Sequence, residues 1–155
     1  MPYIILETRI DVPVDVCFDL ARDIDVHAET TRQTGERAVA GVMHGKIGAG
    51  DTVTFEARHL GVRQRLSSRM TQFDPPHLFA DEMTQGAFKS LTHVHEFMAI
   101  PTGTLMRDTI TWVSPLGVLG TIADTLFVTR HMRNFVTQRN QRLKEIAEAR
   151  QSARA

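Results

Sequence analysis

The sequence predicts an α+β domain in which a curved antiparallel sheet of about seven strands packs against one long C-terminal helix and encloses a cavity. Residues 36–113 favour this class because polar and apolar side chains alternate there, and short links rich in Gly, Pro and Asp divide the alternating runs. Residues 117–149 support it because apolar side chains recur every three or four positions, as on one face of a helix. A strand and two short helices before residue 36 complete the expected order.

The N-terminal segment is expected to form this strand and these helices. Tyr3 to Ile10 is rich in β-forming residues and ends before Pro13, a residue that the first turn of a helix tolerates. Apolar side chains then follow helical spacing as far as Ala21, and Asp23 to Arg32 gives the second short helix. The break near Asp23 predicts a bent pair of helices instead of one rod.

Six more strands are expected, and their short links predict sequential antiparallel hairpins because parallel neighbours need long crossovers. The expected strands are Glu36–Met43, Thr52–Leu60, Val62–Phe73, Leu78–Thr84, Phe88–Ile100 and Thr104–Val113. After Pro115 the long helix is expected to run to about Ala149 across the sheet, because no other segment could cover its apolar face. A twisted sheet curves away from a straight helix, which predicts a cavity between them.

Composition indicates one domain over residues 1–150, followed by a disordered tail over 151–155. The 18 basic and 18 acidic residues balance, so neither nucleic acid nor an anionic membrane is an expected partner. The sequence has no apolar run near ~20 residues and no signal-peptide pattern, so we expect a cytoplasmic protein without membrane insertion, as a monomer or homodimer. The single Cys17 excludes an internal disulfide, and its apolar neighbours indicate a packed thiol.

Alternation along the strands assigns each side chain to one face of the sheet, and the more apolar face should lie against the helix. The apolar residues expected to line the cavity are Phe55, Met70, Phe79, Met83, Leu91, Phe97, Ile110 and Trp112. The same face carries five polar residues, His59, Asp81, His93, His95 and Asp108. A polar group left unpaired in an apolar interior costs about 1–3 kcal/mol. Pairing between histidine and aspartate would remove this cost, although the sequence does not fix the register that decides the pairs.

Three interpretations of the five polar residues remain open. They could stabilise the sheet by pairing with one another, orient a mostly apolar ligand, or take part in catalysis or metal binding. The chemical interpretation would use His93, His95 and Asp81 for acid–base catalysis, or His93, His95 and a carboxylate for metal binding. His-x-His alone is a weak metal signal and the spacing specifies no third ligand, so neither a metal ion nor a cofactor is predicted. His27, on the second short helix, is placed either at the cavity mouth or on an exposed helix face.

Six segments carry a recognisable pattern: DIDVH (23–27), TGERAVAG (34–41), GAGDTVTF (48–55), FDPPHLFADE (73–82), HVHEF (93–97) and DTITWVSPLG (108–117). Together they resemble the SRPBCC ligand-binding proteins of the START-like, polyketide-cyclase-like superfamily, and in particular a bacterial branch in which His-x-His-x-Phe recurs. The resemblance runs over nearly the whole chain and implies a helix-grip fold whose cavity binds lipids, polyketides, quinones or other hydrophobic molecules. Where that branch often has Gly-Pro-Phe and a Trp before the histidines, this chain has Gly86-Ala87-Phe88 and Leu91, so the ligand is not transferred.

The expected function is therefore to bind a hydrophobic or amphipathic small molecule, as a carrier or sensor. One alternative is an enzyme of the cyclase/dehydratase kind, in which a His–Asp pair moves protons. Another is a protein-interaction domain in which the cavity is vestigial. Superfamilies of this kind host many functions, so the fold does not choose among the three.

Overall fold

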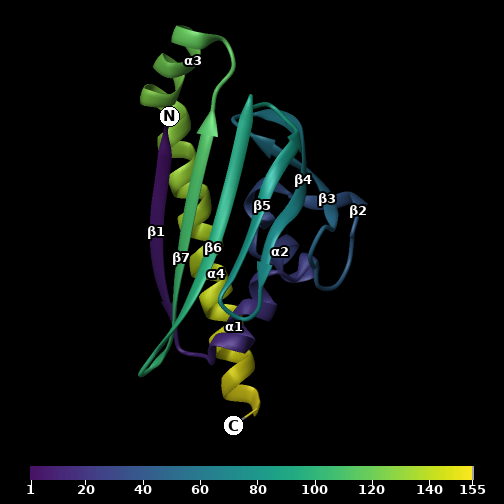
Figure 1. Ribbon diagram of the computed structural model, residues 1–155, viewed down its shortest axis with the longest axis vertical. Helices are drawn as coiled ribbons and strands as arrows, with labels where there is room; N and C mark the ends of the chain where they lie inside the picture. Colours follow the sequence, from purple (N-terminus) through teal and green to yellow (C-terminus); the bar gives the residue numbers. More distant parts are fainter. Residues whose placement is uncertain (155) are drawn as a thin grey trace.

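The computed structural model describes residues 1–154 and contains one seven-stranded antiparallel sheet (Figure 1). The strands are β1 (Tyr3–Ile10), β2 (Arg37–Gly41), β3 (Thr52–His59), β4 (Val62–Asp74), β5 (Leu78–Gln85), β6 (Ser90–Ile100) and β7 (Gly103–Val113). They lie in the order β1-β7-β6-β5-β4-β3-β2, so β2 to β7 form a meander and β1 closes the far edge beside β7. The predicted sheet and its hairpins are confirmed.

The two short helices lie between β1 and β2, as expected. They are α1 (Val14–Ala21) and α2 (Ile24–Thr30), followed by the 3-10 turn η1 (Arg32–Thr34). Asp23 separates them, and its Oδ1 caps α2 by accepting hydrogen bonds from the backbone N–H groups of Asp25 (2.9 Å) and Val26 (3.2 Å). This cap starts a new helix at Ile24 and explains why the pair is bent.

The C-terminal helical segment has three parts, α3 (Gly117–Ala123), the π-helical turn η2 (Asp124–Val128) and α4 (Thr129–Arg154). Only α4 crosses the sheet, whereas α3 extends beyond its end (Figure 1). The expectation that the whole helix covers the sheet is therefore wrong for its first third, where Leu119, Ile122 and Leu126 are 50–68% exposed. These side chains are exposed because the segment lies beyond the end of the sheet, where no strand covers it (Figure 1).

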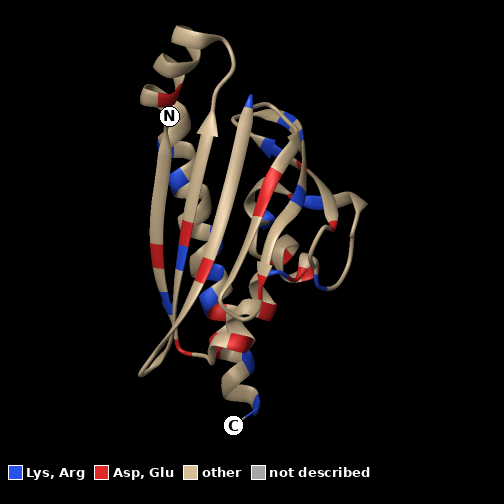
Figure 2. Cartoon of the chain, in the orientation of Figure 1, with Lys and Arg blue, Asp and Glu red and all other residues tan. Residues whose placement is uncertain are grey.

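The end of α4 also differs from the expectation. The helix continues over residues 151–154, so the predicted disordered tail is helical there, and Ala155 lies outside the described residues. Among the helices of residues 1–154, none combines the length and apolarity that crossing a membrane requires. Basic and acidic residues are spread over the strands and α4 and do not gather on one element (Figure 2).

The interior contains two apolar clusters with a layer of polar side chains between them. In the first cluster, the ring of Phe18 lies 5.3 Å from that of Phe97, and Cys17 is buried beside it. The second is built around Trp112. Along β6, Leu91 belongs to the second cluster and Phe97 to the first, so the inward side chains of positions 93 and 95 fall between them. The polar layer defined by His93, His95 and Asp108 interrupts the core where the candidate site lies.

Candidate functional site

A cavity of about 430 Å³ lies between the concave face of the sheet and the helices α2, α3 and α4. Four successive inward residues of β3, namely Val53, Phe55, Ala57 and His59, all line it, as alternation predicts. Cavities that hold small molecules commonly measure about 300–1,000 Å³. The predicted cavity is thus present and has room for a small molecule.

The structure brings most of the predicted site residues to the cavity wall. Those that line it are Phe55, His59, Met70, Phe79, Asp81, Leu91, His93, His95 and Ile110. Met83, Phe97, Asp108 and Trp112 do not line it. Periodicity identifies the face of the strand on which a side chain lies, but not whether other side chains cover it. For this reason these four residues were wrongly predicted to line the cavity.

Each of the four has a different environment. Phe97 is enclosed by Phe18 and Phe79, and Met83 packs beside the second apolar cluster. The indole N–H of Trp112 donates to Oδ1 of Asp124 at 3.0 Å, which fixes η2 against the sheet. Asp108 is 1% exposed and lies beneath the histidines, so it contacts the site without facing the cavity.

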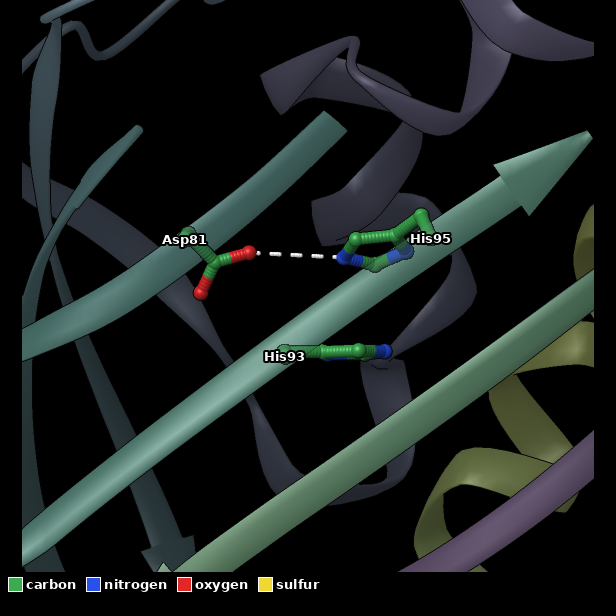
Figure 3. A group of neighbouring side chains, drawn as sticks. All are labelled: Asp81, His93 and His95. Atoms are coloured by element: carbon green, nitrogen blue, oxygen red, sulfur yellow. Dashed lines mark hydrogen bonds and ion pairs between the residues drawn. The ribbon is translucent and has the colours of Figure 1, made fainter. Parts of the chain in front are cut away.

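Three strands supply the histidine–aspartate pairs. The register places Asp81 opposite His93 and His95 opposite Asp108. The hydrogen bonds nevertheless run diagonally, with 2.7 Å between His93 Nε2 and Asp108 Oδ1 and 3.3 Å between His95 Nε2 and Asp81 Oδ2. The two imidazole rings stack with centroids 3.7 Å apart, and the second bond is drawn in Figure 3. The expected pairing of histidines with acids is confirmed, and the structure supplies the register that the sequence lacks.

Helix α4 completes the polar layer with Arg139 and Asn140. The Arg139 guanidinium donates to Asp108 Oδ1 at 2.8 Å, and the Asn140 amide donates to Oδ2 at 2.7 Å. Neither was predicted from the sequence, because charged and amide side chains on a helix are usually solvated. A signal was present, since both lie on the same helical stripe as the buried Val136 and Leu143.

Burial and neighbouring charges set the protonation of the polar layer. Burial alone would raise the pKa of Asp108, but the charge of Arg139 and the bond from His93 hold that pKa well below its usual value. Burial, with the nearby ring of His95, lowers the pKa of His93 to about 4. Burial would also lower the pKa of His95, but its contacts with Asp108 and Asp81 raise it instead. Burial would raise the pKa of Asp81, but its bond to His95 and the nearby histidines lower it. At neutral pH the site therefore holds two carboxylates, Asp81 and Asp108, and a neutral His93.

A second polar group lies across the same cavity. His27 on α2 and Glu36 before β2 are joined at 2.7 Å, while His59 Nδ1 on β3 lies 3.0 Å from His131 Nε2 on α4. His59 Nε2 is also 3.9 Å from Glu36. His27 is at the cavity wall, one of its two expected positions. Glu36 and His131 also line the cavity but were missed, because only tertiary packing brings the start of an expected strand and the middle of the long helix together there.

The sheet and its helices match known structures along their length. A protein from Thermus thermophilus superposes with a TM-score of 0.79 and 20% identity over 96% of this chain and 98% of that one. The Zhui aromatase/cyclase from a Streptomyces species gives 0.78 and 13% identity over 96% and 94%. Ginseng major latex-like protein 151 from Panax ginseng gives 0.71 and 14% over 94% and 97%. No protein-family model and no curated protein sequence matches the chain. At these identities the likeness establishes the helix-grip fold, as expected from the resemblance.

Proposed function

We propose that this helix-grip domain binds an amphipathic small molecule in its cavity. The proposal rests on the cavity of about 430 Å³, whose walls are mostly apolar and include a few polar side chains. The apolar body of the ligand would lie between β3, β5 and α4, where burial contributes roughly 25 cal/mol per Å² of apolar surface. Its polar group would face Asp81, His93 and His95.

This arrangement supports orientation of the ligand as well as burial. Asp81 and His93 are both at the cavity wall, and their side chains are 27% and 16% exposed. A hydroxyl or carbonyl placed there could bond to their exposed polar atoms, while a purely apolar molecule would displace water from those atoms without replacing its hydrogen bonds, which is unfavourable. An amphipathic ligand therefore fits better than a hydrocarbon.

Filling the cavity is expected to weaken ligand binding. Ala57 is 7% exposed and lines the cavity, so Ala57→Phe should place a ring in the space the ligand needs. With the amphipathic dye 8-anilinonaphthalene-1-sulfonate as probe, we expect its dissociation constant to rise about tenfold or more, a change of at least about 1.4 kcal/mol. The measurement is a fluorescence titration, accompanied by mass spectrometry of small molecules extracted from the purified protein.

The matched control is Ala99→Phe, which makes the same substitution at an exposed position of β6. Its dye affinity should equal that of the unmodified protein. Near-ultraviolet circular dichroism must stay unchanged in both variants, because loosely packed proteins also bind this dye. Equal dye binding by Ala57→Phe and the unmodified chain, together with no co-purifying molecule, would contradict the proposal.

A second candidate function, acid–base catalysis, is favoured by one observation. His93 is held by Asp108 at 2.7 Å, is neutral at pH 7 and lies on the cavity wall, which suits a general base. If the protein is an enzyme, His93→Gln should still bind the co-purifying molecule but should no longer convert it. The measurement is mass spectrometry of that molecule after incubation with each protein, and conversion by the variant at the original rate would exclude His93 as the base.

A further inference from the structure

Three side chains on β5 and β6 have the composition of a metal site. Asp81, His93 and His95 each offer one possible ligand atom, and these three atoms all lie within 4.8 Å of one another. All three side chains are at the cavity wall, and Figure 3 shows Asp81 and His95 pointing toward one another from neighbouring strands, with the ring of His93 stacked beside that of His95. Two imidazoles and one carboxylate suit zinc and other divalent first-row transition metals, whereas Mg²⁺ and Ca²⁺ prefer oxygen ligands alone.

Asp108 occupies the place of the carboxylate that commonly supports metal-binding histidines from behind. A histidine that binds metal through one ring nitrogen usually bonds through the other to a carboxylate or carbonyl, which fixes the ring. Asp108 Oδ1 lies 2.7 Å from His93 Nε2 and 3.1 Å from His95 Nδ1. The contact between Asp108 and His95 Nδ1 lacks the geometry of a hydrogen bond. Among the described residues, the buried Nδ1 of His95 has no hydrogen-bond partner.

The two nitrogens of His95 thus face two different carboxylates. Nε2 points toward Asp81 and the cavity, while Nδ1 points toward Asp108 and the interior. The bond to Asp81 is long, at 3.3 Å. A metal ion at about 2.0–2.1 Å from each ligand atom would lie between His95 Nε2 and the carboxylate of Asp81. The side chains would have to close in on the ion, because their atoms are separated by up to 4.8 Å.

The charge of the polar layer also favours a cation. Asp81 and Asp108 place two carboxylates beside the histidines, against the one guanidinium of Arg139. We propose that Asp81, His93 and His95 bind one divalent first-row transition-metal ion, with Asp108 as the supporting carboxylate. Three protein ligands leave at least one coordination position open toward the cavity.

The proposal is tested with Co²⁺ alone, without any organic ligand, so its outcome is independent of dye binding to the cavity. The full chain is dialysed against EDTA, freed of chelator and titrated while the visible absorption of bound Co²⁺ is recorded. A saturable band at one equivalent is expected. Asp81→Ala and His95→Gln should abolish that band, and Asp108→Asn should weaken Co²⁺ binding by about 10–100-fold.

Two variants test whether the ion binds at this site. His131→Ala removes the other histidine pair of the cavity, and His44→Ala removes the exposed pair with Asp25. Both should keep the band. If Asp81→Ala does not fold by circular dichroism, Asp81→Asn, which preserves the shape of the side chain, takes its place. An unmodified chain that shows no saturable band, a band that survives in Asp81→Ala or Asp81→Asn, or a band lost in His131→Ala would each overturn the proposal.

Discussion

Replacing Asp108 by alanine is expected to lower the free energy of unfolding by about 3–5 kcal/mol, the cost of breaking a buried ion pair by removing one partner. Asp108 accepts hydrogen bonds from Arg139 and Asn140 and pairs with His93. Without its carboxylate, the guanidinium of Arg139, which is 4% exposed, would stay buried without the carboxylate that it contacts at 2.8 Å. The measurement is urea denaturation followed by circular dichroism, with EDTA present so that metal does not contribute.

Arg107→Ala is the matched control, because Arg107 is the preceding residue of β7 and points to the opposite face. Its contact with Glu7 is 3.5 Å long and both side chains are more than one third exposed. Exposed pairs of this kind contribute about 0–1 kcal/mol. If Asp108→Ala were as mild as Arg107→Ala, the polar layer would not depend on this carboxylate, and its place at the centre of the site would be wrong.

The sheet could be predicted from sequence because its signals are local. Alternation fixes which side chains share a face, and links such as Leu60-Gly61 force the chain to reverse within a few residues. At Leu60 the backbone takes a positive φ of 52° and at Gly61 one of 78°, which is the geometry of a tight turn. The helix that covers the sheet was less predictable. Its π turn at Asp124 depends on the bonds from Trp112 and Ser114, which are tertiary contacts.

The candidate site was predicted only in part, because some of its features follow from local alternation and others depend on tertiary contacts. The inward direction of His93, His95 and Asp81 follows from period two, and the structure confirms it. Which histidine meets which acid depends on register, and register depends on the bulges of β4 and the lengths of the hairpins. Arg139 was missed because charged residues on a helix are usually solvated, and its burial makes sense only once Asp108 is known to lie opposite it.

The stability of the protein should fall by about 3 kcal/mol between pH 6.5 and pH 4 through His93 alone. In the unfolded chain His93 takes up a proton near pH 6.5, but in the folded protein its pKa is lowered to about 4. Acidification through this window therefore favours the unfolded state. Burial lowers the pKa values of His59 and His131 as well, which adds to the loss. The groups that face His93 are His95 on its own strand, Asp81 on β5 and Asp108 on β7.

His95 acts in the opposite direction, so its contribution to stability decreases at higher pH. Its pKa is raised in the folded protein, so its contribution is fully present below pH 6.5 and is lost as the pH rises through the folded pKa. Chemical denaturation at several pH values, with EDTA present, measures how the free energy of unfolding changes with pH on the acid side and on the alkaline side. His93→Gln should reduce the loss of unfolding free energy between pH 6.5 and pH 4. His44→Gln, at a side chain that is 83% exposed, should leave that loss unchanged. If stability falls equally steeply on acidification in His93→Gln and in the unmodified protein, the lowered pKa of His93 is contradicted.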